Sequence, residues 1–517
     1  MGNNNIKKNY IYNLIYQIFK IIIPIISTPY LARTMGAEAI GIYGYTLSIT
    51  TGFIILGSLG MATYAQREIA YVQDDITKRT KIFYEIIILK LITLGISTII
   101  YWFAFAKQGE YSIYYKILVI ELIANCIDIS WFFQGMEEFK KIITRNVVIK
   151  VVTLILIFIF IKTPDDLWKY ILIYVLSTFF ANFILWIYLP KYIKKDSFKD
   201  IDLKQHIKPI IILFIPQIAT QIYSVLDKAM IGYLVPDIRE VGYYEQAQKI
   251  INILLTVITS LGIVMLPRIS KIYAEGKKEN IQQYIEKSFN FLFFIGMPMI
   301  FGIIAVSDSF VPIFFGNGYE KVEILINIMS CIILFMGISN ILGTQYLLPT
   351  KKQKEYTISV FAGAIINVIT NFMLIRKYQS IGATIATVIA ELIVAVVQLY
   401  FARNVISVKK IVKKAPKYMI SATFMFAVCI IIKPILQNGI VCLFIQVSIG
   451  VVIYLLNLFI LRDEFFNNIL NQIIIKLKNM INSNNNNKNK EENKCHKERE
   501  WKRKKRQIKK ERRVIKL

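Results

Sequence analysis

The sequence predicts an all-α polytopic membrane protein with about fourteen transmembrane helices, arranged as two six-helix lobes plus two C-terminal helices. The first observation is composition: 55% of the 517 residues are apolar, only 19% are charged, and the mean hydropathy is +0.51. The second is that the charges gather between long runs of Ile, Leu and Phe. Soluble domains carry about 25% charged residues. This composition therefore excludes a soluble enzyme, a secreted disulfide scaffold and a disordered chain.

Fourteen apolar runs are long enough to cross the hydrocarbon core as helices, which takes roughly 20 residues each. Membrane-barrel strands are excluded, because the runs are too long and do not alternate polar with apolar residues. The predicted spans are residues 10–32, 39–63, 82–106, 112–135, 142–161, 168–190, 209–235, 243–266, 288–310, 322–348, 356–375, 380–402, 415–435 and 438–461.

The distribution of basic residues supports this count through the positive-inside rule. With a cytoplasmic N-terminus, the cytoplasmic segments before residue 462 hold twenty-nine Lys and Arg residues, and the external segments hold nine. One miscounted span would exchange inside and outside for every later segment. We therefore expect a multi-pass protein of the cytoplasmic (inner or plasma) membrane with both termini in the cytoplasm.

The longest polar segment before the tail, residues 191–208, divides the spans into two sets. We expect a six-helix lobe at 1–190, a cytoplasmic connecting loop at 191–208, a second six-helix lobe at 209–410 and helices 13 and 14 at 411–461. An internal similarity at a fixed offset of 201 residues relates Gly41-Ile42-Tyr43 to Gly242-Tyr243-Tyr244. Since six is even, the two lobes would be parallel repeats about an axis along the membrane normal.

The last segment, residues 462–517, is strongly basic and contains an Asn run followed by a dense Lys/Arg block. This composition is typical of a disordered cytoplasmic tail, and its charge suits the surface of anionic lipid headgroups. We expect no nucleic-acid partner for the body of the protein. RNA contact by the tail is the minor alternative.

Motifs for catalysis and for cofactors are absent from the sequence. There is no GxxxxGK(S/T) loop, hence no visible ATPase, and no GxSxG. His206 and His496 are the only histidines and the five cysteines lack CxxC spacing, which argues against a metal site or a catalytic dyad. We therefore expect a protein that is not an enzyme and that takes neither cofactor nor metal.

Ionisable residues within or at the ends of the predicted spans are the candidates for function, because burying one costs at least about 2.5 kcal/mol. Cations suit an anionic cargo such as a phosphate or diphosphate, and acids suit a coupling proton or sodium ion. For each, an interhelical salt bridge or snorkelling to the interface is the alternative. The cavity cations are Lys20, Arg33, Lys90, Lys228 and Arg268, and the coupling-ion or salt-bridge acids are Asp128, Asp227 and Glu391.

Helix geometry refines some of these expectations. Asp227 and Lys228 point about 100° apart on a helix, so they are not expected to pair with each other. Glu121 and Asp128 are seven residues apart and would share one helix face. Glu121 lies nearer a span end, which favours a salt bridge or snorkelling. Arg33 and Arg268 close their spans at opposite faces, so each is equally well read as an interfacial anchor.

Four local motifs resemble signatures of bacterial and archaeal polysaccharide-unit flippases of the O-antigen and capsule type. They are Pro29–Gly36 followed by Gly41–Tyr45, Tyr64–Ala70, Asp227–Gly232, and Val241–Ala247. The resemblance extends in layout to about residue 461. It implies the fold of the multidrug/oligosaccharidyl-lipid/polysaccharide exporter superfamily, with two lobes around a cationic cavity. The family pattern matches here at Arg33 and at Asp227–Lys228, whereas the basic tail is no part of it.

The resemblance implies a flippase that moves polyprenyl-diphosphate-linked oligosaccharide units by alternating access, for cell-surface polysaccharide synthesis. Its expected partners are membrane lipid, the lipid-linked glycan and a polysaccharide polymerase. A multidrug or organic-cation exporter of the same superfamily is the alternative, since acids and lysines balance within the spans. A membrane-embedded glycosyltransferase or polymerase is the alternative from another class, and it would need a catalytic acid on a sizeable loop.

Overall fold

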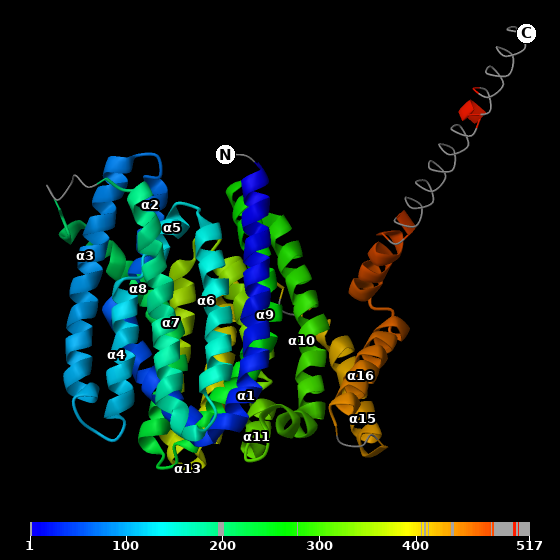
Figure 1. Cartoon of the computed structure of the whole chain (residues 1–517). Coiled ribbons are helices and arrows are strands. Elements are labelled where there is room, and N and C mark those ends of the chain that lie inside the picture. Colours follow the sequence, from blue (N-terminus) through cyan, green and yellow to red (C-terminus); the bar gives the residue numbers. More distant parts are fainter. Residues whose placement is uncertain are drawn as a thin grey trace, which may run out of the picture. The chain divides into compact units, whose positions relative to one another are not determined.

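The computed structural model describes residues 3–194, 201–276, 278–404, 406–407, 410–411, 413–435, 439–476, 478–479, 500–502 and 505. The chain forms two compact units, residues 1–451 and 452–517, and each is described by itself. The first unit is a bundle of long helices that run alongside one another (Figure 1). Over the described ranges the chain is helical and contains no β-strand, which confirms the predicted fold class.

The N-terminal half of the bundle runs to Lys191 and the C-terminal half from Lys204 to Ala402. The N-terminal elements are α1 (Asn3–Ser58), α2 (Met61–Tyr71), α3 (Ile76–Tyr101), η1 (Trp102–Ala106), α4 (Ser112–Cys126), α5 (Ser130–Gly135), α6 (Phe139–Phe160), η2 (Pro164–Asp166), α7 (Leu167–Tyr188) and η3 (Leu189–Lys191). The later elements are α8 (Lys204–Leu234), α9 (Arg239–Ala274), α10 (Lys278–Phe315), α11 (Glu320–Met329), α12 (Ile332–Ser339), η4 (Asn340–Leu347), α13 (Gln353–Ala402), α15 (Ala415–Ile432), η5 (Lys433–Ile435) and α16 (Ile440–Ile460).

The helices account for the predicted number of spans. In the part of the chain that the structure describes, eleven helices are long and apolar enough to cross a membrane. Two of them, Ile21–Ser58 and Gln353–Ala402, bend at internal kinks and each covers two predicted spans. Helix α8 is not among the eleven and corresponds to the predicted span 209–235. Counting both kinked helices twice and adding α8 gives fourteen.

The two kinks differ in how their backbone is accommodated. Gly36 has φ 73°, a left-handed conformation that glycine adopts without a Cβ clash. Gln379 has φ 55° and ψ −130°, which is strained for a residue with a side chain. Its side-chain oxygen accepts a hydrogen bond from Lys321 Nζ at 2.8 Å. The neighbouring Ser380 hydroxyl donates to Glu240 at 2.5 Å, so side chains of α9 and α11 hold this kink.

The predicted span 112–135 is not one helix, because α4 ends at Cys126 and α5 begins at Ser130. A break at membrane depth is tolerated when other groups bond the freed backbone carbonyls. Side chains do so here: Asp128 O accepts from Lys90 Nζ (2.8 Å) and Trp131 Nε1 (3.1 Å), Ile127 O accepts from Trp186 Nε1 (2.7 Å), and Ala124 O accepts from Asn182 Nδ2 (2.8 Å). The expectation that Glu121 and Asp128 share one continuous helix face is therefore wrong.

The segment that connects the two halves ends against α3. Helix α8 begins at Lys204, inside the predicted loop 191–208, of which residues 195–200 lie outside the described part. The buried Glu85 carboxylate accepts the Asp202 N–H at 2.9 Å and contacts His206 Nε2 at 2.9 Å. His206 Nδ1 in turn lies 2.7 Å from the Tyr64 hydroxyl. These contacts fix the start of α8 on α2 and α3.

In the second unit, residues 464–476 are helical. The Asp463 carboxylate accepts the Phe466 N–H at 2.9 Å, which is the usual N-cap arrangement. The predicted basic tail, 462–517, otherwise lies mostly outside the described residues.

Candidate functional site

A cavity of about 370 Å³ lies within the helix bundle, and both halves line it. The N-terminal half contributes Leu47, Ser48 and Thr51 of α1, and the C-terminal half contributes α8, α9, α11, α12 and α13. The cavity joins apolar walls to a few polar groups, as ligand sites generally do. Its ionisable lining residues are Asp227, Lys228, Tyr244 and Glu391.

Asp227 lies at the wall of this cavity with its side chain completely buried. Three neutral donors hold its carboxylate: Tyr244 Oη at 2.7 Å, Asn371 Nδ2 at 2.6 Å and Thr387 Oγ1 at 2.8 Å. No described lysine or arginine forms an ion pair with it, in contrast to its neighbour in sequence. A buried carboxyl with only neutral neighbours and clustered side-chain oxygens is chemically suited to a proton or a hard cation.

Lys228 points into a different environment, as the helical geometry predicts for adjacent residues. Its Nζ lies 2.8 Å from Glu245 Oε2, and Lys249 Nζ lies 3.4 Å from Glu245 Oε1. The three side chains are 12–31% exposed. Two ammonium groups on one carboxylate leave an excess positive charge beside the cavity. Such an arrangement can bind an anionic group as a pair of point charges.

The structure separates the predicted site residues. Of the proposed cavity cations, Lys228 lines the cavity described above. Lys90 is buried in the N-terminal half, where it bonds the Asp128 carbonyl at the helix break. Arg268 is exposed and its guanidinium stacks 4.6 Å from the Tyr284 ring centroid. Lys20 lies in α1, and its side chain falls outside the part that the structure describes.

The proposed acids divide in the same way. Asp227 and Glu391 both line the cavity, and Glu391 is 3% exposed. Asp128 instead bonds locally, because its carboxylate accepts the Ser130 N–H at 2.9 Å and the Ser130 hydroxyl at 2.5 Å. These two bonds hold the segment just before α5 at the helix break, which is a structural use of the carboxylate.

Sequence reasoning did not single out Glu245, Lys249, Tyr244 or Asn371 as site residues. A usable signal existed for the first two, since an acid and a lysine four residues apart within one apolar span stand on the same helix face. The neutral partners of Asp227 carried no such signal, because Tyr and Asn side chains occur throughout the spans.

Both halves also meet at the bundle end that is predicted to be external. A Cβ on Gly41 would lie 2.1 Å from Ile238 O, and a Cβ on Gly242 would lie 2.1 Å from Ala37 O. The two related Gly-containing motifs of the sequence therefore face each other, with α1 and α9 in backbone contact. Tyr319 Oη donates to Ala32 O at 3.0 Å, and Arg33 NH2 donates to Ile313 O at 2.5 Å. These contacts close the predicted external end.

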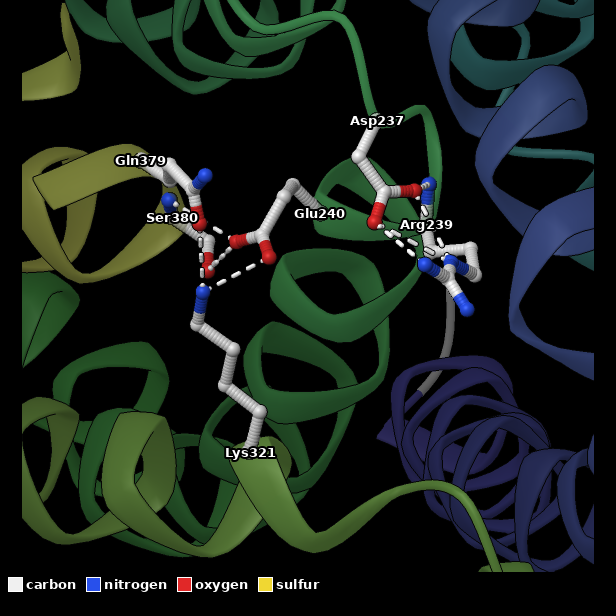
Figure 2. Close-up of polar contacts among 6 residues, drawn as sticks. All are labelled: Asp237, Arg239, Glu240, Lys321, Gln379 and Ser380. Carbon is white, nitrogen blue, oxygen red and sulfur yellow. Dashed lines mark hydrogen bonds and ion pairs between the residues drawn. The ribbon is translucent and has the colours of Figure 1, made fainter.

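A cleft of about 750 Å³ lies outside this contact, and Arg33, Glu38, Asp165 and Arg239 line it. Figure 2 shows the ion pairs beside it, with Glu240 between Lys321 and Ser380, and Asp237 next to Arg239. Glu240 Oε1 accepts from Lys321 Nζ at 2.6 Å, and this pair is largely buried. The Asp237–Arg239 pair is exposed, and hydrogen bonds from Arg239 lower the pKa of Asp237.

The chain has clear relatives among known proteins. A family model described as polysaccharide biosynthesis protein matches residues 6–273, and a second, MatE, matches residues 212–373. A protein of Escherichia coli K12 named O-antigen transporter is 26% identical over 77% of this chain and 97% of its own length. The Staphylococcus aureus capsular polysaccharide biosynthesis protein CapF is 23% identical over 77% and 99%.

The fold also occurs among solved structures. The lipid II flippase MurJ in an inward closed conformation superposes with a TM-score of 0.67 at 17% identity, covering 90% of this chain and 100% of that one. At this identity the likeness concerns the fold alone.

Proposed function

The chain belongs to the polysaccharide biosynthesis protein family, and on that premise we propose that it is a flippase for polyprenyl-diphosphate-linked oligosaccharide units. Relatives named for O-antigen transport and capsule synthesis, matched over nearly their whole length, support this. The diphosphate-sugar head would enter the cavity while the prenyl chain stays in lipid. A polar path is required, because the charged head cannot cross hydrocarbon unaided.

The observation that carries the proposal within the structure is the pair of lysines on one carboxylate. Lys228 and Lys249 share Glu245, so the three groups together carry one net positive charge, and an arriving diphosphate can contact both ammonium groups while the carboxylate keeps its partners. Keeping these pairs intact matters, since breaking a buried ion pair without replacement is strongly unfavourable. The closed end at Gly41 and Gly242 supports alternating access, with the cavity opening at one face at a time.

Asp227 and Glu391 are proposed as the sites of ion coupling. Asp227 has the stronger case, because neutral donors alone surround it. The orientation proposed from charge, with both termini in the cytoplasm, places the closed end outside. A polysaccharide polymerase that takes up the flipped product, and the division into lobes at residues 1–190 and 209–410, remain part of the proposal.

Reconstituted vesicles test the proposed function. We expect wild-type protein to move a fluorescent lipid-linked oligosaccharide between leaflets, and the double variant Lys228→Ala, Lys249→Ala to lose this movement. The exposed pair variant Asp237→Asn is the matched control and should retain it. Unchanged glycan movement in the double variant, together with reduced efflux of organic cations, would overturn the flippase in favour of the multidrug exporter, whose MatE model matches residues 212–373.

A further inference from the structure

A buried carboxyl in the N-terminal half has no role in the site described above. Glu121 of α4 is 8% exposed, and its Oε2 has no hydrogen-bond partner among the residues that the structure describes. Ion pairs hold Glu245, and three donors hold Asp227, whereas no described basic side chain pairs with Glu121. The salt bridge or snorkelling that its sequence position favours is therefore not what the structure places there.

The missing partner indicates the protonation state in which Glu121 fits its surroundings. A carboxylate with an unbonded oxygen at membrane depth is strongly unfavourable. The neutral acid removes most of that cost, because it carries no net charge. The surroundings thus favour a bound proton on this side chain.

The groups that face Glu121 come from the helices that pack against α4. Helix α7 brings the Thr178 hydroxyl and the Tyr174 phenol near the carboxyl, and α1 brings Tyr43. On α3 the buried Lys90 ammonium donates to the Asp128 carbonyl. The short η1 segment, Trp102–Ala106, carries no titratable residue. The polar neighbours of the carboxyl are therefore neutral hydroxyls.

The tyrosines connect this carboxyl to the substrate site. The Tyr43 ring centroid lies 4.9 Å from that of Tyr170 and 5.9 Å from that of Tyr174. The phenols of Tyr43 and Tyr174 each lie within electrostatic range of both Glu121 and Glu245. Tyr174 and Thr178 also line a cavity of about 340 Å³, so water in this cavity would lie beside two neighbours of the carboxyl. Tyr43 and Tyr174 are therefore the groups through which a change of charge at Glu121 would reach the Lys228–Glu245–Lys249 network.

We propose that Glu121 is a proton-binding site of the N-terminal half, coupled through the Tyr43–Tyr174 contact to occupancy of the Lys228–Glu245–Lys249 network. One proton from water at one face forms an O–H bond at Glu121 and leaves to water at the other face in each transport cycle. The coupling rests on the proposed flippase function, whereas the bound proton itself does not.

Infrared spectroscopy of the full chain in nanodiscs tests the proton directly. We expect a protonated-carboxyl C=O band in the wild type at neutral pH, absent in Glu121→Gln and present in Glu110→Gln, a control at an exposed loop position. The Asp227→Asn variant identifies any part of the carboxyl band that comes from Asp227 instead of Glu121. Identical carboxyl bands in wild type and Glu121→Gln would overturn the proton site, and this holds even if no lipid is moved.

Vesicles with an imposed pH gradient test the coupling. We expect the gradient to accelerate movement of a lipid-linked oligosaccharide by wild type and by Glu110→Gln. In Glu121→Gln, movement of the lipid without a gradient should persist, and the gradient should no longer accelerate it. Full acceleration in Glu121→Gln would refute the coupling. Failure of wild type to move the lipid at all would refute the flippase proposal and, with it, the coupling, but it would leave the infrared result standing.

Discussion

The contact between Gly41 and Gly242 leads to a prediction about which face of the protein is open. Each glycine lies against backbone of the opposite half, so replacing either with alanine adds a Cβ that has no space. The matched control is Gly52→Ala on the same helix α1, where a new Cβ would meet Val225 Cγ1 at 3.8 Å, an ordinary contact. All three changes add one methyl group to a helix.

The magnitude follows from the geometry. The new Cβ would lie 2.1 Å from a carbonyl oxygen, whereas carbon–oxygen contacts between helices are about 3.3 Å or longer. Helices α1 and α9 must therefore separate by about 1 Å for each substitution. Overpacking of this kind costs about 1–3 kcal/mol, and a bias of that size shifts a two-state equilibrium by roughly 5–150-fold. The closed external end should lose that much of its population relative to open forms.

Distance measurements between spin labels provide the assay. Labels at Asp165 and Asn317, which line the cleft from opposite halves, are attached after the five native cysteines are replaced. We expect Gly41→Ala and Gly242→Ala to shift the label–label distribution toward longer distances, and Gly52→Ala to leave it unchanged. A wild-type distribution in the double variant Gly41→Ala, Gly242→Ala would refute the idea that this contact closes the external end.

Three further outcomes are expected from thermal unfolding in detergent. Asn182→Ala should lower stability by about 1–3 kcal/mol, because it leaves the Ala124 carbonyl unbonded at the helix break; an unchanged Tm would contradict the assigned role of that bond. Glu240→Gln should lower stability by about 1–3 kcal/mol, and Asp237→Asn by less than about 1 kcal/mol. The reason is that the Glu240–Lys321 pair is largely buried, whereas the Asp237–Arg239 pair is exposed. Equal losses of stability in the two variants would refute this ranking. The Lys169 ammonium and two backbone N–H groups lower the pKa of Asp166. The contribution of this carboxylate to the stability of the fold is therefore complete above the ordinary carboxyl pKa and is lost as pH falls. The Tm difference between wild type and Asp166→Asn should shrink in acid, and a difference that grows would contradict this.

The helical architecture could be predicted from sequence because bilayer thickness fixes the length of a span and loop charge fixes its direction. Both signals are local and sum over short windows. The position of the kink at Gly36 could also be predicted from sequence, because this glycine lies between two apolar runs. The kink at Gln379 could not, because Lys321 and Glu240 hold it from two other helices. The break after Cys126 likewise depends on donors from α3, α5 and α7.

The candidate site shows the same division. Apolar context alone marked Asp227, Lys228, Lys90, Asp128 and Glu391 as unusual, since each ionisable group in a span stands out. The sequence did not distinguish a charged residue that lines the cavity from one that bonds backbone groups at a helix break.

By itself the sequence determined the membrane class, the number of spans and a short set of buried charges, because hydrophobic length and charge asymmetry are properties of the chain read in order. Only the tertiary structure decided that Lys228 shares Glu245 with Lys249, that Lys90 bonds a carbonyl, and that Glu121 Oε2 has no hydrogen-bond partner among the described residues. Those outcomes depend on which side chains of distant helices come within about 3 Å of one another, the range of a hydrogen bond. Packing sets that distance, and no local pattern in the chain encodes it.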